Sequence, residues 1–193
     1  MSPNNSFKPT PLRGAAWLRH QALGSGKVKI RRELPFDTAA IEAVTIAAFL
    51  DAEHTGHTEQ HIVRDLRRAG QLTVSLVAED DGTIVGHVAV SPVSVSSGAE
   101  HWYGLGPISV SPARQSRGIG AMLMQRALAD LRELGAAGCV VLGDPRYYSR
   151  FGFVAIPSLE LPGVPAQYFQ AISFIGSMPC GQVAYHDAFA ARA

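Results

Sequence analysis

The sequence is short of cysteine, of charge and of long apolar runs, and each shortage excludes a class of protein. Cys139 and Cys180 are its two cysteines, too few for a disulfide scaffold or a cysteine-ligated zinc site. Both lie in apolar stretches, so we expect buried, reduced thiols. No apolar run approaches the roughly 18 residues that a transmembrane helix needs, so no membrane partner is expected.

An excess of charge of one sign is also lacking. Lysine and arginine total 17 against 16 aspartate and glutamate residues, which leaves a formal net charge of +1. Binding to nucleic acid is therefore not expected, because it relies on a strongly basic surface. Hydrophobic residues make up 47% of the 193 residues and charged residues 17%, which is typical of a folded chain. At this length one domain buries about 70% of its unfolded surface.

Residues 1–26 differ from the rest of the chain, because they contain several prolines and glycines and apolar residues at no clear period. We expect a poorly ordered tail there, followed by a single domain at 27–190. The tail lacks the continuous apolar core of a signal peptide, so we expect a cytoplasmic protein.

Hydrophobic periodicity predicts an α/β domain with a mixed sheet. A strand is expected from Val28, and the turn signal Asp-Asp-Gly at 80–82 joins two β-rich runs, 72–79 and 84–95, as a hairpin. The segment 118–134 has the strongest helical period. The other expected elements are helices from Asp37 to Leu50 and from Thr58 to Ala69, a short helix from Pro145, and strands at 102–110, 139–143, 151–156, 168–174 and 182–185.

The junction between the strand ending at Val110 and the helix beginning at Gly118 indicates the chemistry. The first turn of a helix has unpaired N–H groups and a partial positive charge, which attract phosphate. Gly118 and Gly120 leave the backbone accessible, while Arg114 and Arg117 add positive charge. These residues favour a phosphate site, although a glycine-softened helix start with two solvated arginines is the structural alternative.

Two other phosphate-binding loops do not fit this junction. A Walker loop needs GxxxxGK followed by serine or threonine, and the sequence has no such string. A dinucleotide fingerprint needs a third glycine where this chain has Leu123.

The residues at 115–120, Gln-Ser-Arg-Gly-Ile-Gly, resemble the Q/R-x-x-G-x-G/A signature of the GCN5-related N-acetyltransferases, which bind acetyl-CoA. The segment YYSRFGF at 147–153 is similar to a tyrosine-containing helix that ends in Gly-Phe in the same family. Together with GHVAVSPVSV and VAYHDAF, the pattern most resembles the YhbS-type predicted acetyltransferases, over about 28–189. The resemblance implies a central mixed, mostly antiparallel sheet flanked by helices.

The resemblance also implies roles for particular residues. Backbone amides of 115–120 are expected to hold the coenzyme pyrophosphate, and Ile108 and Val110 to pair with the pantetheine arm, which enters between the strands 105–110 and 139–142. An N–H near Ile108 is expected to polarise the thioester carbonyl. The coenzyme-binding residues implied are Ile108, Ser109, Val110, Gln115, Ser116, Arg117, Gly118, Ile119 and Gly120.

Tyr148 aligns with the family tyrosine beside the coenzyme sulfur, so it is the implied general acid, while Tyr147 is expected to be structural. The general base stays open, and a water relay is an alternative to a dedicated side chain. The candidate bases are Glu53, His54, His57, His87, Ser91, Glu100 and His101. No metal is expected, because the histidines show no ligand spacing with a third partner.

The implied reaction is transfer of an acetyl group from acetyl-CoA to an amine of a small molecule or peptide. A non-catalytic acyl-CoA-binding or sensing module and transfer to a hydroxyl are the alternatives. The acceptor is expected between 49–61 and 159–169, where Asp51, Glu53 and Glu59 favour a cationic amine. Edge strands near the C-terminus leave a homodimer open.

Overall fold

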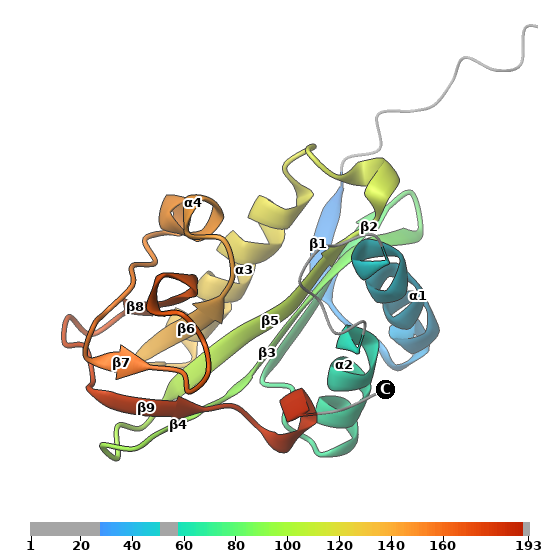
Figure 1. Ribbon diagram of the computed structural model, residues 1–193. Helices are drawn as coiled ribbons and strands as arrows, with labels where there is room; N and C mark the ends of the chain where they lie inside the picture. Colours follow the sequence, from blue (N-terminus) through green and yellow to red (C-terminus); the bar gives the residue numbers. More distant parts are fainter. Residues whose placement is uncertain (1–27, 51–57, 191–193) are drawn as a thin grey trace, which may run out of the picture.

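The computed structural model describes residues 28–50 and 58–190, so the tail expected at 1–26 lies outside the described residues. A six-stranded mixed sheet forms the centre of the molecule (Figure 1). Its strands, in spatial order, are β1 (Lys29–Arg32), β2 (Val74–Asp80), β3 (Thr83–Pro92), β5 (Trp102–Val110), β6 (Gly138–Leu142) and β8 (Phe169–Ser173). Neighbours pair antiparallel except β5 and β6, which are parallel. The predicted mixed α/β fold is therefore confirmed.

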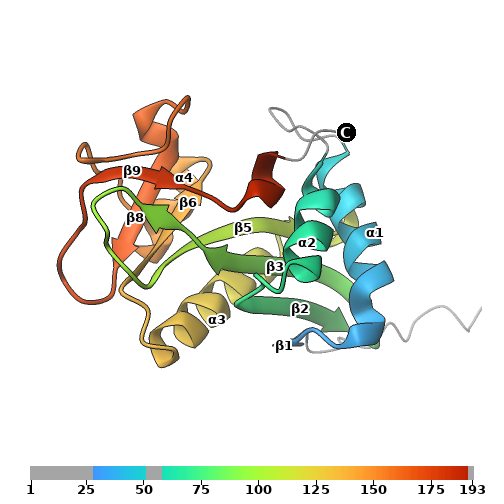
Figure 2. The ribbon, with the colours of Figure 1, turned by 90° about the horizontal axis from the view of Figure 1, so that it is seen from below.

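Helices cover both faces of this sheet. On one face lie α1 (Thr38–Phe49) and α2 (Glu59–Arg68), and on the other lies α3 (Ile119–Glu133) (Figures 1 and 2). Leu123, Ala127 and Leu131 on α3 are fully buried against the sheet, as the period of 118–134 predicts. Ile41 on α1 and Val63 on α2 form a second core on the opposite face.

The predicted hairpin between β2 and β3 is confirmed. Asp81 and Gly82 both have positive φ, at 50° and 76°, which is the geometry of the tight turn that best fits twisted antiparallel strands. Asp37 precedes α1 as predicted, but its carboxylate does not cap that helix. It accepts hydrogen bonds from Arg31 and from the Leu34 N–H instead.

A second, three-stranded sheet stands beside the first at the end where β5 begins (Figure 1). It consists of β4 (Ser94–Val95), β9 (Gly181–Ala184) and β7 (Leu159–Glu160), in that order. The remaining short elements are α4 (Pro145–Tyr148) and the 3-10 turns Pro35–Asp37, Pro112–Arg114, Ser149–Phe151, Ala166–Tyr168 and Asp187–Ala190. From β9 of this small sheet, the chain runs to the 3-10 turn Asp187–Ala190, which packs against α2.

Two expectations are wrong. The stretch 151–156 is not a strand, because Gly152 turns the backbone to a φ of 89° and Val154 makes a single bridge to Ala171. Cys180 is exposed, since it lies in the surface connection between β8 and β9, where apolar neighbours in sequence do not bring burial. Cys139 is buried as expected, and burial raises the pKa of its thiol.

Candidate functional site

The two parallel central strands separate along their length. Their pairing runs from Trp102 opposite Gly138 to Leu105 opposite Val141, after which β5 continues to Val110 without β6. Beyond that point β5 pairs only with β3, so one of its edges is open. The predicted gap between these strands is therefore present.

The open edge of β5 offers the backbone groups of every second residue. The Ser111 N–H donates to the carbonyl of Val85 on β3. Because backbone groups alternate in direction along a strand, the N–H and C=O groups of Ile108 and Val110 point the other way, toward the gap. The Val110 carbonyl accepts a hydrogen bond of 3.1 Å from the Gln115 side chain, which ties the following loop to the strand. The backbone groups of Ser109 face β3 and not the gap. Its buried side chain packs on the α1 side of the sheet, where the hydroxyl lies 3.3 Å from that of Thr45.

The loop after β5 ends in a left-handed residue. Gly118 is the N-cap of α3 with a φ of 82°, and a Cβ added there meets nothing within 4 Å. The space above the helix start is therefore open to a bulky group. Within the described residues, no hydrogen bond is formed by the N–H groups of Arg117, Gly118, Ile119 or Gly120. Together they leave a row of unpaired N–H donors at the helix start, the kind of arrangement that attracts anions.

Tyr147 lies against this helix start. A Cβ on Gly120 would stand 2.8 Å from the Tyr147 hydroxyl, so only glycine lets the two approach. The Arg150 guanidinium stacks 4.5 Å from the centre of the Tyr147 ring. The structural role of Tyr147 stays a prediction, and its contact with Gly120 depends on the approach of α4 to α3, which no local pattern predicts.

The two arginines of the loop differ in whether their charge is paired with a carboxylate. Arg117 is exposed, and none of the ion pairs among the described residues involves it. Arg114 instead forms an ion pair of 2.7 Å with Asp80, at the β2–β3 hairpin, which neutralises its charge. The expected contribution of Arg114 to a phosphate site needs this correction, because the hairpin carboxylate already balances it.

Tyr148 lies on the other side of the gap, with 9% of its surface exposed. Its ring packs edge-on against Tyr147 and Phe153. A Cβ on Gly143 would stand 2.6 Å from the Tyr148 ring, so glycine is needed where β6 ends. Burial raises the pKa of the Tyr148 phenol to about 12, and the phenol is therefore protonated at any physiological pH.

A cleft of about 610 Å³ opens where the gap meets α2 and the second sheet. On one side it is lined by Leu105, Gly106, Pro107 and Ile108 of β5, by Leu142 and by Tyr148. Its other wall is largely apolar and consists of Phe49, Ile62, Leu161, Pro162, Val164 and Phe189. Both segments expected to form the acceptor site, 49–61 and 159–169, contribute to it. Its size is typical of small-molecule sites.

Besides Tyr148, four polar side chains line this cleft: Glu59, Tyr185, His186 and Asp187. Glu59 Oε2 and the Tyr185 hydroxyl are buried and have no hydrogen-bond partner in the described part of the chain. His186 accepts the Ala188 N–H at Nδ1, at 3.1 Å, which leaves its other ring nitrogen as the donor. The sequence does not predict a role for Tyr185 or His186. They follow β9, which pairs with β4 over only two residues, too few to give a periodic pattern.

None of the candidate general bases that the structure describes lines the cleft. Glu100 and His101 are exposed before the start of β5, at the end remote from the gap. Ser91 is buried on β3 and does not line the cleft. The candidates Glu53, His54 and His57 lie outside the described residues.

His87 belongs to a buried chain of polar groups between β1, β2 and α2. Its Nε2 lies 2.8 Å from the Ser75 hydroxyl, which donates to Glu33. Arg67 donates two hydrogen bonds of 2.9 Å to the same carboxylate. Burial lowers the pKa of His87 to about 4, against the weaker opposing pull of Glu33. His87 is therefore a neutral structural histidine and does not face the cleft.

This histidine makes stability depend on pH. Between about pH 6.5 and pH 4, His87 is protonated in the unfolded chain but stays neutral in the folded chain. Acidification over this range therefore lowers the free energy of unfolding by about 3 kcal/mol. Glu33, whose pKa is lowered by Arg67 and Ser75, adds a loss in the same direction at lower pH. Urea unfolding between pH 7.5 and 4.5 measures the slope. His87→Gln should flatten it, and an unchanged slope in that variant contradicts the assignment.

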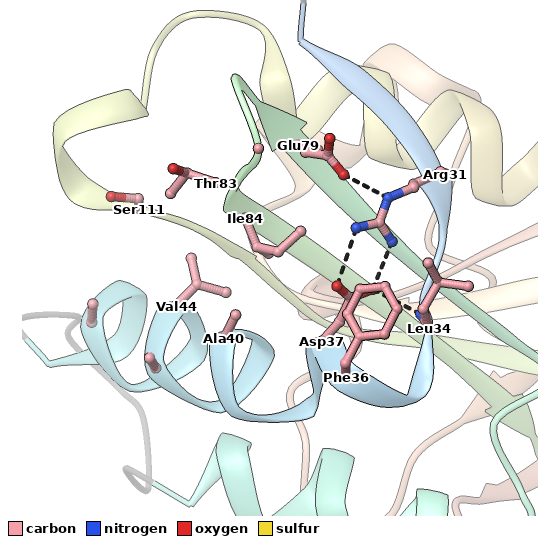
Figure 3. Close-up of a pocket in the computed structure, with 13 residues that line it drawn as sticks. Arg31, Leu34, Phe36, Asp37, Ala40, Val44, Glu79, Thr83, Ile84 and Ser111 are labelled. Atoms are coloured by element: carbon pink, nitrogen blue, oxygen red, sulfur yellow. Dashed lines mark hydrogen bonds and ion pairs between the residues drawn. The ribbon is translucent and has the colours of Figure 1, made fainter.

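A second groove, of about 770 Å³, lies between α1 and the β2–β3 hairpin (Figure 3). Its one cationic side chain, Arg31, is held by Asp37 and Glu79 at 2.6 and 2.7 Å. The rest of the lining is mainly small or apolar, with Ala40 and Ile84 among the residues drawn. None of the predicted site residues lines this groove, and its one cation is already paired with two carboxylates.

Among residues 28–50 and 58–190, no group of three or more histidine, cysteine, aspartate or glutamate side chains is arranged to hold a metal ion. The same part of the chain contains no helix that is both long and apolar enough to cross a membrane.

Residues 38–153 match the model of the acetyltransferase (GNAT) family. The chain therefore belongs to the GNAT acetyltransferases, and the resemblance in its sequence is confirmed.

Its relatives specify the branch of this family. YhbS of Escherichia coli K12, named an uncharacterized N-acetyltransferase, is 41% identical over 125 residues, which cover 64% of this chain and 72% of YhbS. The crystal structure of E. coli YhbS in complex with CoA covers 89% of this chain and 97% of its own, with 34% identity and a TM-score of 0.77. A GNAT acetyltransferase of Brucella melitensis in complex with acetyl-CoA is 49% identical, with a TM-score of 0.76, and covers 85% of this chain and 99% of its own.

Proposed function

We propose that the gap beside β5 holds acetyl-CoA, and that the adjoining cleft is where this N-acetyltransferase passes the acetyl group to an amine. The observation that carries the proposal is the continuity of three features. The open helix start leads to the open edge of β5, and that edge leads to the cleft lined by Tyr148. Acetyl-CoA supplies the acetyl group as a reactive thioester.

The chain's own groups fit such a ligand. The backbone N–H groups from Ser116 to Gly120, unpaired among the described residues, are proposed to hold the pyrophosphate, with the Arg117 side chain adding charge. The Gln115 N–H, which the sequence included in this set, already donates to the Pro112 carbonyl. Ile108 and Val110 present backbone groups to the gap, where the amides of a pantetheine arm find strand-like partners. The Ile108 N–H is then placed to polarise the thioester carbonyl, because Ile108 lines the cleft itself.

Tyr148 is proposed to assist the departing thiolate. Its phenol pKa of about 12 lies above the roughly 8.5 of a thiol, so the phenol stays protonated and donates a hydrogen bond to sulfur as negative charge develops there. The low exposure of Tyr148 excludes water from this bond and strengthens it.

Acetyl-CoA-dependent release of thiol in the presence of amines tests the function. Turnover with formation of an N-acetyl product is the expected result. Binding of acetyl-CoA without turnover of any amine is the outcome that contradicts it and favours a sensing module.

We also propose a cytoplasmic location, on the ground that the co-substrate is a cytoplasmic metabolite. A homodimer is proposed through β8, an edge strand of the main sheet whose outer side is met only by the bridge from Val154 within the described residues. Light scattering at several concentrations measures it, and a constant monomer mass contradicts it.

A further inference from the structure

The cleft has one wall that no part of the coenzyme scheme uses. Beyond β5 and Tyr148, it is bounded by α2, by the connection after β7 and by the segment after β9. This wall faces the end of the gap where the acetyl group is proposed to lie, so its side chains meet whatever accepts that group. The inference drawn from it rests on the proposed function.

Most of this wall can offer no hydrogen bond. Ile62 and Phe189 are joined by Leu161, Pro162 and Val164, all of which present hydrocarbon to the cleft. A hydroxylated ligand entering here would lose its hydrogen bonds to water and gain none in return, which is costly. An aromatic or branched aliphatic group instead gains about 25 cal/mol for each Å² of apolar surface that it buries.

Glu59 is the exception within the wall. It stands at the start of α2, and its Oε2 is buried without a partner among the described residues. The Tyr185 hydroxyl, in the same cleft, is likewise buried and has no partner among the described residues, and its ring packs so close to Gly104 that a Cβ there would overlap it. Buried polar atoms without partners are rare in folded proteins, and two in one cleft indicate a ligand that satisfies them.

Asp187 adds a second carboxylate at the exposed end of the cleft. The carboxylates of Glu59 and Asp187 line the same cleft, and together they favour a cation and oppose an anion. The His186 Nδ1 accepts a hydrogen bond from the Ala188 N–H, so this nitrogen carries no proton and the ring adds no positive charge against the two carboxylates.

We infer that this cleft selects small primary amines borne on an apolar body and without a carboxylate, with Glu59 receiving the amine. The hydrocarbon wall takes the body, the Tyr185 hydroxyl completes the polar end, and Asp187 turns away free amino acids. Sugar-like amines are disfavoured because the hydrocarbon part of the wall, which takes the body of the amine, has nothing to pair with their hydroxyls.

Three amines test the inference, with thiol release as the rate assay and thermal unfolding with acetyl-CoA as the binding assay. Phenethylamine is the apolar monoamine, phenylalanine is the same body with an added carboxylate, and glucosamine is a polyol amine. We expect kcat/KM for phenethylamine to exceed the values for the other two by about tenfold or more. Equal or reversed values would overturn the inference.

Variants separate the roles of the two carboxylates. Glu59→Gln should raise KM for phenethylamine by about tenfold or more, because a buried charged partner is lost. The shift of unfolding temperature by acetyl-CoA should not change. Glu133→Gln, at an exposed position on α3, is the matched control and should leave both unchanged. An unaltered KM in Glu59→Gln overturns the role of Glu59.

Asp187→Asn is the second variant, on an exposed side chain whose change leaves folding intact. It should raise kcat/KM for phenylalanine relative to that for phenethylamine by about two- to fivefold. No gain overturns the role of Asp187. If acetyl-CoA shifts the unfolding temperature but phenethylamine is not acetylated, the acceptor inference fails while the coenzyme site stands. If acetyl-CoA gives no shift, the proposed function itself fails.

Discussion

Gly118→Glu is expected to abolish the binding of acetyl-CoA. The glutamate places a negative charge in the open space above the helix start, where the pyrophosphate is proposed to lie. In the unsubstituted protein, acetyl-CoA at about 100 times its Kd adds roughly 2.7 kcal/mol to the free energy of unfolding. For a domain of this size, that raises the unfolding temperature by about 5–10 °C. Differential scanning fluorimetry with and without acetyl-CoA measures the shift.

A matched substitution separates charge from backbone strain at this position. Gly118 has a φ of 82°, where most side chains cost about 1–2 kcal/mol, while asparagine is tolerated better. Gly118→Asn should therefore lower the unfolding temperature slightly but keep a shift with acetyl-CoA. A full shift in Gly118→Glu would show that the coenzyme lies elsewhere.

Tyr148→Phe is expected to lower kcat by about 10²- to 10⁴-fold, because the departing thiolate loses its hydrogen-bond donor. The Km for acetyl-CoA should change little, since the ring and its packing against Phe153 remain. Initial rates of thiol release from pH 7 to pH 10 measure the effect. Because the pKa of Tyr148 is about 12, its own titration should produce no alkaline fall in the rate over this range.

The neighbouring tyrosine provides the contrast. Tyr147 touches the start of α3 through its hydroxyl, so Tyr147→Phe should raise the Km for acetyl-CoA and leave kcat nearly unchanged. If Tyr148→Phe keeps a normal kcat across the pH range, the acid role is wrong. If both variants lose kcat equally, the two tyrosines act together through their packing.

The elements with a local signal could be predicted from the sequence. The helix at 118–134 differs from α3 by a residue at each end, because its apolar period reflects burial against a single sheet face. The strand at 102–110 coincides with β5. The stretch 151–156 misled because its apolar residues pack around the left-handed turn at Gly152 and not along a strand.

The site was predictable only where it follows the chain continuously. The loop at 115–120 and Tyr148 carry motifs, so the coenzyme side of the site can be predicted from the sequence. The second sheet, by contrast, is held together by strands of two to four residues with no readable period. Its placement of Tyr185 and Asp187 beside Glu59 depends on contacts between distant segments. The same reason explains the pairing of Arg114 with Asp80, which crosses from one loop to another.

The family model ends at residue 153, whereas most of the outer wall of the cleft, from Leu161 to Phe189, comes after it. The proposed acceptor cleft is therefore divided between two stretches of chain: Glu59 and Ile62 lie inside the matched range, and most of the hydrocarbon wall lies after it. Selection can change the later stretch and keep the earlier one, as long as the short strands still pair. Grafting the segment after 153 between related acetyltransferases should accordingly transfer the preference for the apolar body of the amine, and the thiol-release assay with phenethylamine measures the transfer.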